Sequence, residues 1–252
     1  MKSFLTGLKN AIKAILGLLG VEVSGYPTFR GLIFRGFWIR LGRPRRAGSL
    51  KPFNGYLAFQ ELRNWEFHSV IDVGSGGGGA ARAFAQNGKA VTCVDLGRST
   101  YFREGAAHGN EDDSVRVIPG DFLELPIQGA FDLVWASHVL EHQKNVGAFL
   151  RRLADHCHEG SIICITVPVC DYRLVGGHLT LWTPGLLAYN LVVNGIDCRD
   201  SKLVQDGREF SILVRKRAIA LPTLDFDSGD VDRLKEFFPA GFREGQSSLR
   251  YW

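Results

Sequence analysis

The sequence of 252 residues lacks clustered cysteines and long uninterrupted hydrophobic runs. Its five cysteines are odd in number, scattered and free of C-x-x-C spacing, which argues against a disulfide framework or a zinc ribbon and favours a reducing compartment. A transmembrane helix needs about 20 unbroken apolar residues, but Lys9 and Lys13 interrupt the apolar stretch at 1–20. A secretory signal is an alternative for this stretch, but its apolar part would be short and no A-x-A cleavage site follows it. We therefore expect a cytoplasmic protein.

Positive charge is concentrated at the N-terminus. The net charge is +4, and residues 1–51 alone carry +9 from ten basic residues and one acid, which leaves −5 for the rest of the chain. No Asn/Asp-Pro-Pro-Tyr/Phe motif is present in the stretch ASHVLEH at 136–142. Because the larger part of the chain is acidic, nucleic acid is not an expected partner.

The basic N-terminal segment has two parts. In MKSFLTGLKNAIKAILGLLG the apolar residues recur at helical spacing and the lysines occupy other faces, which predicts an amphipathic helix. FRGLIFRGFWIRLGRPRR interleaves arginines with aromatic residues, a composition that suits anionic lipid or an anionic substrate. Residues 1–46 are therefore a candidate contact with the inner membrane surface or a membrane-associated synthase. Packing against the chain's own domain is the alternative.

A regular alternation of helices and strands begins near residue 54 and predicts a doubly wound α/β sheet with its ligand at the carboxyl edge of the strands. The dipeptide Asp206-Gly207 between two strand-like runs predicts a hairpin. We expect three regions: an extension at 1–53, a catalytic domain at 54–217 and a C-terminal extension at 218–252. The predicted strands are 69–74, 90–95, 115–118, 131–136, 161–167, 198–205 and 209–217, and the predicted helices are 54–65, 80–88, 145–157, 184–194 and 231–238.

The stretch VIDVGSGGGG at 70–79 is the most informative in the chain. Gly74-x-Gly76-x-x-Gly79 fits a dinucleotide fingerprint, and Asp95 stands where an acid would bind a ribose diol. Asp72, however, lies inside the strand, where its charge would repel a pyrophosphate but favour a sulfonium ligand that carries an ammonium group. An acid and an aromatic residue, Asp121 and Phe122, follow the third strand and could bond and cover an adenine. The pattern favours S-adenosylmethionine over NAD.

Several of these motifs together resemble class I S-adenosylmethionine-dependent methyltransferases of the ubiquinone-biosynthesis type, and also methyltransferases associated with bacterial polysaccharides. They are VIDVGSGGGG, Asp95, GDFLELP and FDLVWASHVLEHQKNVGAFLRRL, and the resemblance covers residues 54–217. It implies a Rossmann-like seven-stranded sheet whose last strand is antiparallel. It also implies a set of cofactor-binding residues: Asp72, Gly74, Ser75, Gly76 and Gly78 for the methionine half, Asp95 for the ribose, Asp121 and Phe122 for the adenine, Ser137 and His138 for the sulfonium region, and Leu96 without an assigned part of the cofactor.

Three histidines are candidate catalytic groups because histidine has the unperturbed pKa nearest neutrality. His138 and His142 are four residues apart and would share a face if their segment is helical. His178 lies in GGHLTLWTPG, where relatives with sugar-type acceptors similarly carry a histidine followed by an aromatic residue and Thr-Pro. We expect no metal site, since the run His156–His158 falls at a predicted helix end without further ligands.

Three functions follow as hypotheses. The first is methyl transfer to an oxygen of a glycan or glycolipid in bacterial surface-polysaccharide synthesis. The second is methyl transfer to a small lipid-soluble acceptor such as a quinone precursor. The third is a non-catalytic methyltransferase-like module that binds a membrane-associated synthase, although a scaffold would not need the cofactor acids. An NAD-dependent oxidoreductase is a weaker alternative.

Overall fold

The computed structural model describes residues 51–99, 102, 114–171 and 173–244, and the backbone of two short strands near the N-terminus. These strands, β1 (Val21–Glu22) and β2 (Arg40–Leu41), pair with each other in antiparallel orientation. The predicted amphipathic helix and most of the arginine-rich segment lie outside the described residues. The chain divides into two compact units, Met1–Lys51 and Pro52–Trp252. The larger unit contains every predicted site residue.

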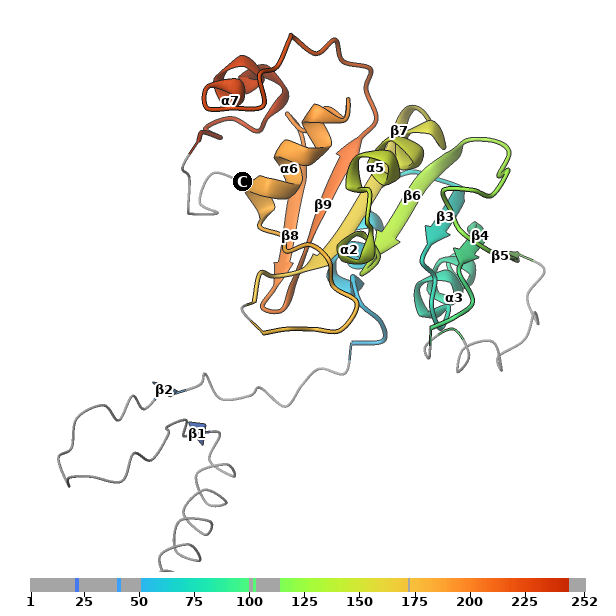
Figure 1. Ribbon diagram of the computed structural model, residues 1–252. Coiled ribbons are helices and arrows are strands. Elements are labelled where there is room, and N and C mark those ends of the chain that lie inside the picture. The colour runs from blue at the N-terminus through green and yellow to red at the C-terminus, as the bar shows by residue number, and fades with distance from the viewer. Residues whose placement is uncertain are drawn as a thin grey trace, which may run out of the picture. The chain divides into compact units, whose positions relative to one another are not determined.

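A seven-stranded mixed sheet forms the centre of the larger unit (Figure 1). Its order is β5-β4-β3-β6-β7-β9-β8, in which β9 runs antiparallel to both of its neighbours and the first five strands are parallel. This confirms the predicted doubly wound fold with an antiparallel last strand. The strands are β3 (Ser69–Val73), β4 (Ala90–Asp95), β5 (Val115–Pro119), β6 (Phe131–Ser137), β7 (Cys157–Pro168), β8 (Lys202–Asp206) and β9 (Glu209–Arg215).

The central strands are buried on both faces, as their continuous apolar sequences predict. In β7, Ile163 and Ile165 belong to the core on one face of the sheet, while Ile162 and Cys164 belong to the core on the other. All four side chains are at most 1% exposed. Two hydrophobic cores therefore enclose the sheet.

Helices cover both faces of the sheet (Figure 1). Capping agrees with the sequence, since the Thr183 hydroxyl accepts a hydrogen bond from Leu186 N at 3.2 Å and proline occupies the next position. Asn145 caps the preceding helix through Ala148 N at 3.0 Å. One face carries α5 (Val146–Asp155), α6 (Pro184–Val193), α7 (Asp230–Arg233) and η2 (Lys235–Phe237), and the other carries α2 (Tyr56–Leu62) and α3 (Gly79–Gln86).

Two details differ from the sequence prediction. The strand predicted at 161–167 begins earlier, at Cys157, so that β7 also contains residues 157–160. The register of β7 against β6 shifts here, and Gly160, at φ 84°, donates its N–H to Lys216 O at 2.9 Å. Glycine permits this irregularity because it tolerates positive φ. The predicted helix at 231–238 is split into α7 and η2.

The C-terminal segment is part of the main core. Leu234, Phe237 and Phe238 are at most 6% exposed and pack in the same cluster as α5 and α6. Phe237 O also accepts a hydrogen bond from Cys198 N at 2.9 Å. Within the part of the chain that the structure describes, no helix is long and apolar enough to cross a membrane.

Replacement of Phe237 by alanine should lower the free energy of unfolding by about 3–5 kcal/mol, because it leaves a cavity in the main core. Urea denaturation of the full chain measures this change. Phe226→Ala is the matched control, since that ring is 78% exposed, and we expect its effect to stay within about 0.5 kcal/mol. Equal effects of the two substitutions would contradict the structural role of the C-terminal segment.

Candidate active site

The candidate site lies where the strand order reverses. After β3 the chain adds β4 and β5 on one side, and β6 then pairs with the other side of β3. The arrows of β3 and β6 end at the same edge of the sheet (Figure 1). In open α/β sheets, the loops that follow two such strands run in opposite directions, and the space between them forms a crevice for a ligand. The predicted cofactor residues follow these strands.

The glycine-rich loop after β3 needs glycine at three positions. Gly74, Gly76 and Gly78 have φ values of 75°, 50° and 70°, a region that other residues enter only with strain. A Cβ atom on Gly74 would also lie 2.9 Å from the side chain of Val139. The loop is closed by a hydrogen bond from Gly78 N to the carbonyl of Ser75 at 2.8 Å. This geometry exposes backbone rather than side chains to a ligand.

Asp95 at the end of β4 joins the glycine loop to the next loop. Its Oδ2 accepts a hydrogen bond from Gly76 N at 2.9 Å, and its Oδ1 accepts one from Gly97 N at 2.8 Å. Each carboxylate oxygen keeps a further lone pair, which is available to a ribose hydroxyl. The neighbouring Leu96 is 56% exposed and offers an apolar surface beside this acid.

Asp72 is a buried acid without a compensating cation. Its side chain is 2% exposed, and Oδ2 has no hydrogen-bond partner among the described residues. Burial, together with the negative charge of Asp95, raises the pKa of Asp72 to about 7. A cationic group bound nearby would favour the ionised form, as expected for an ammonium-bearing ligand.

Asp121 and Phe122 are placed differently from each other. Asp121 is exposed, and its Oδ1 accepts a hydrogen bond from Leu123 N at 2.9 Å. The Phe122 ring is 6% exposed and packs against Phe149 and His156, with ring centroids 5.7 and 5.5 Å away. We therefore correct the prediction that the Phe122 ring covers an adenine, because this ring packs in the hydrophobic core.

The end of β6 carries Ser137 and His138. The Ser137 hydroxyl is buried without a hydrogen-bond partner among the described residues. His138 has a φ of 55°, and its Nε2 lies 2.9 Å from Glu209 Oε2 while its Nδ1 lies 3.3 Å from Glu141 Oε1. Burial disfavours the charged ring, but the two carboxylates outweigh this effect and raise the pKa of His138 to about 9. A ring already protonated at neutral pH is poorly suited to act as a general base, so the geometry favours a positioning role.

Sequence reasoning missed Glu141 and Glu209. Both are buried, and Glu209 Oε1 additionally accepts a hydrogen bond from Gly55 N at 3.0 Å. A signal was available, because Glu209 is the first residue of the predicted strand EFSILVR, whose residues are mainly apolar. A buried acid in such a place requires a partner, but its identity depends on the sheet order.

His142 and His178 lie together where the loop between β7 and α6 meets the segment after β6. The loop between β7 and α6 folds back over η1 (Leu140–His142), since Leu179 N and Thr180 N both donate to Glu141 O, at 2.7 and 3.2 Å. The two imidazole rings are 5.0 Å apart and nearly perpendicular. His142 Nδ1 is 2.8 Å from Gly177 O. Residues 35 positions apart along the chain are thus brought together by this loop.

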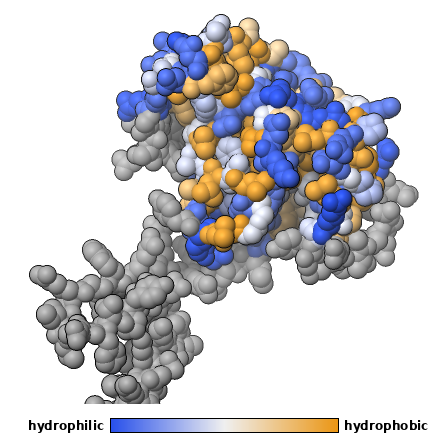
Figure 2. Space-filling view, viewed as in Figure 1, coloured by the Kyte–Doolittle hydropathy of each residue, from blue (hydrophilic) through white to orange (hydrophobic). Residues whose placement is uncertain are grey.

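The same loop presents apolar side chains to solvent. Figure 2 shows hydrophobic residues gathered at the lower edge of the visible face, over the loop between β7 and α6. Those more than 40% exposed are Leu174, Val175, Leu179 and Leu181. An apolar surface beside the polar candidate site suits an amphipathic acceptor.

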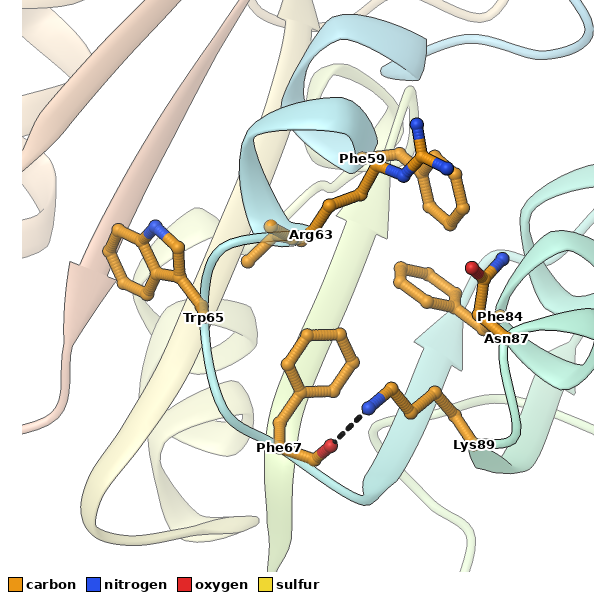
Figure 3. A pocket seen from close by; sticks show the side chains of 8 residues that line it. Phe59, Arg63, Trp65, Phe67, Phe84, Asn87 and Lys89 are labelled. Carbon is orange, nitrogen blue, oxygen red and sulfur yellow. Dashed lines mark hydrogen bonds between the residues drawn. The ribbon is translucent and has the colours of Figure 1, made fainter.

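A separate cavity of about 260 Å³ lies between α2, α3 and the start of β3. Figure 3 shows its aromatic lining, in which Lys89 Nζ donates to Phe67 O at 2.7 Å and lies 4.5 Å from the Phe67 ring centre. Phe67 and Lys89 precede β3 and β4, so this cavity belongs to the amino edge of the sheet. None of the predicted site residues lines it, and we do not assign it to the active site.

Comparison with known proteins agrees with this fold. Residues 71–165 match the family model described as a methyltransferase domain. The chain is 31% identical over 125 residues to a ubiquinone biosynthesis O-methyltransferase of Caulobacter vibrioides, covering 46% of this chain and 49% of that protein. It is 28% identical over 112 residues to a tRNA U34 carboxymethyltransferase of Pseudoalteromonas atlantica, covering 44% and 35%. The chain thus spans about half or less of the length of these relatives.

Solved structures show the same architecture. A Burkholderia thailandensis 1,6-didemethyltoxoflavin-N1-methyltransferase, solved with S-adenosylhomocysteine, superimposes with a TM-score of 0.51. Its sequence is 23% identical, and the match covers 63% of this chain and 75% of that chain. At this identity the likeness shows the fold alone.

Asp72→Asn should stabilise the protein at pH 8 by at least about 1 kcal/mol, since each unit of pKa shift is worth about 1.4 kcal/mol. Between pH 3.8 and about 7 the unfolded chain loses the Asp72 proton while the folded chain keeps it. The wild-type free energy of unfolding therefore falls as pH rises through this window. Urea denaturation at pH 4 and pH 8 measures the difference, which should nearly vanish at pH 4.

Asp121→Asn is the control for this prediction because that side chain is exposed. We expect it to give no stabilisation that grows with pH. A gain for Asp72→Asn that is the same at both pH values would refute the buried-charge explanation.

Proposed function

We propose that the chain, which contains a class I S-adenosylmethionine-dependent methyltransferase domain, transfers a methyl group from S-adenosylmethionine to an oxygen of an acceptor. The observation that carries the proposal is the glycine loop with left-handed residues at 74, 76 and 78, closed onto Asp95 beside the buried Asp72. An NAD pyrophosphate would meet two acids here, whereas a cationic methyl donor is attracted by them.

Residues of three loops would hold the cofactor. The methionine half lies against Gly74–Gly78, including Ser75, where its ammonium group benefits from the negative charge of Asp72. Asp95 accepts from the ribose, and Leu96 and Asp121 border the adenine. Phe122 contributes through its backbone, because its ring is in the core. The Ser137 hydroxyl, which has no hydrogen-bond partner among the described residues, would form a polar contact near the sulfonium end of the cofactor.

Methyl transfer depends mainly on how the acceptor oxygen is aligned with the methyl group of the cofactor. The acceptor oxygen attacks the methyl carbon in line, the carbon–sulfur bond breaks, and its electron pair stays on sulfur to give S-adenosylhomocysteine. The enzyme must orient the oxygen and exclude water, and a hydroxyl acceptor must also lose its proton. His178, half-buried on the loop that borders the site, is the candidate to contact this oxygen.

Of the two acceptor classes, an apolar molecule that carries a hydroxyl group, such as a quinone precursor, has the stronger support. The exposed leucines and valine of the loop between β7 and α6 provide a surface for an apolar body. The similarity to a ubiquinone biosynthesis O-methyltransferase points to the same class.

A glycan or glycolipid acceptor is the second candidate. It is supported by polar groups beneath the apolar loop, since Thr180 Oγ1 and both oxygens of Glu141 are buried without hydrogen-bond partners among the described residues. The basic segment at 1–46 is proposed to bring the chain to the inner membrane surface or to a synthase. This segment lies mostly outside the described residues.

S-adenosylhomocysteine at 100 times its Kd should stabilise the full chain by about 2.7 kcal/mol, whereas NAD should give no thermal shift. Asp95→Asn removes one carboxylate oxygen and should weaken S-adenosylhomocysteine binding at least tenfold. Asp155→Asn, at the exposed end of α5, is the control and should bind normally. A thermal shift with NAD instead would revive the oxidoreductase alternative. No shift with either ligand would support the non-catalytic module.

Incubation with methyl-labelled S-adenosylmethionine and an envelope extract distinguishes the acceptors. We expect label in the lipid fraction, and at least a tenfold loss of label on His178→Ala while S-adenosylhomocysteine binding is retained. Label in the glycan fraction would favour the second candidate. Unchanged labelling by His178→Ala would remove this residue from the site.

A further inference from the structure

Glu141 is the most completely buried acid of the candidate site. Its side chain is 0% exposed, and neither carboxylate oxygen has a hydrogen-bond partner among the described residues. Oε1 forms an ion pair with Nδ1 of His138 at 3.3 Å, outside hydrogen-bond geometry, and Oε2 has no partner among the described residues. A buried carboxylate is costly unless it is paired, hydrogen-bonded or bound to a metal. Most of the binding capacity of Glu141 is therefore unused.

Two imidazoles lie next to this carboxylate. One ligand atom each of Glu141, His142 and His178 lie within 4.8 Å of one another. His142 Nδ1 is committed to the carbonyl of Gly177 at 2.8 Å, so the neutral ring keeps a lone pair on Nε2. Such a hydrogen bond from the second ring nitrogen to a backbone carbonyl is the usual support of a metal-binding histidine.

We propose that Glu141, His142 and His178 bind a divalent cation on the acceptor side of the site, with zinc preferred. Two imidazoles and one carboxylate form a typical zinc ligand set that leaves a coordination position open. The same set is too rich in nitrogen for magnesium, which prefers oxygen ligands. This proposal replaces the expectation from sequence that the chain has no metal site.

The fold permits the small adjustment that the cation requires. Ligand atoms of a tetrahedral zinc ion at about 2.1 Å lie about 3.4 Å apart, so separations that now reach up to 4.8 Å must shorten by as much as about 1.4 Å. His178 lies on a largely exposed loop that is tied to η1 through the N–H groups of Leu179 and Thr180. A small shift of this loop closes the site without disturbing the sheet.

The role of the cation rests on the proposed function. A cation held by these three residues would act as a Lewis acid toward an acceptor hydroxyl, whose proton would pass to solvent water as its oxygen forms the bond to the methyl carbon. Sulfur leaves with the electron pair of the broken carbon–sulfur bond, as S-adenosylhomocysteine. The acceptor class is then a hydroxyl compound, and no side-chain base is needed.

Isothermal titration of the chelator-treated full chain with zinc chloride tests the proposal. We expect one zinc ion per chain, and at least tenfold weaker binding for His142→Ala and for His178→Ala. His68→Ala is the control, since this exposed histidine lies at the opposite edge of the sheet, just before β3, and it should bind zinc as the wild type does. Magnesium chloride should bind at least tenfold more weakly than zinc.

Binding of S-adenosylhomocysteine, measured on the same samples, shows whether each variant is folded and separates the two proposals. Wild-type protein that binds S-adenosylhomocysteine but not zinc would overturn the metal site and leave the proposed function standing. Zinc binding that is unaffected by His142→Ala and His178→Ala, or magnesium binding tighter than zinc binding, would also overturn it. Zinc binding without S-adenosylhomocysteine binding would support the metal site and count against the proposed function.

Discussion

The buried carboxylate of Glu209 ties together three parts of the chain that are distant in sequence. Its two oxygens contact Gly55 N, at the start of α2, and His138 Nε2, after β6. A side chain at Gly55 would collide with Trp135, because a Cβ atom there would lie 2.7 Å from the indole. The end of β6, the start of β9 and the helix on the opposite face are thereby fixed relative to one another. The orientation of the acceptor side depends on this arrangement.

Buried polar atoms without hydrogen-bond partners occur at the candidate site and also elsewhere among the described residues, as at Trp135 and Arg152. Asp72, Ser137, Glu141 and Thr180 each have a buried polar atom that lacks a hydrogen bond among the described residues. Buried polar atoms normally have hydrogen-bond partners in a folded protein. At a binding site, a bound ligand can supply the missing partner. On the cofactor side the unpaired group is an acid that favours a cationic ligand. On the acceptor side it is an acid flanked by imidazoles.

Conservation of the fold does not extend to the acceptor. The proteins similar to this chain include a ubiquinone biosynthesis O-methyltransferase, 31% identical, and a tRNA U34 carboxymethyltransferase, 28% identical. In this fold the sheet and the glycine loop form the cofactor site, while the loops around them differ between proteins and select the acceptor. In this chain we propose that the loop between β7 and α6 has that role. The apolar residues of that loop, and the histidine within it, are therefore the residues that we propose to contact the acceptor.

The sequence alone determined the sheet and the glycine loop, because strand periodicity and a glycine-rich turn are local patterns. It also predicted Asp72 and Asp95 as cofactor-binding acids from their places in and at the end of a strand. It could not decide the role of Phe122, whose ring faces the core, or find Glu141 and Glu209 as partners of His138. The sequence also gives no sign that His142 and His178 are neighbours. The loop between β7 and α6 brings their ring centres to 5.0 Å from each other. These relations join residues between 3 and 71 positions apart. Only the tertiary structure decides them, since burial and long-range contact depend on how the strands are ordered.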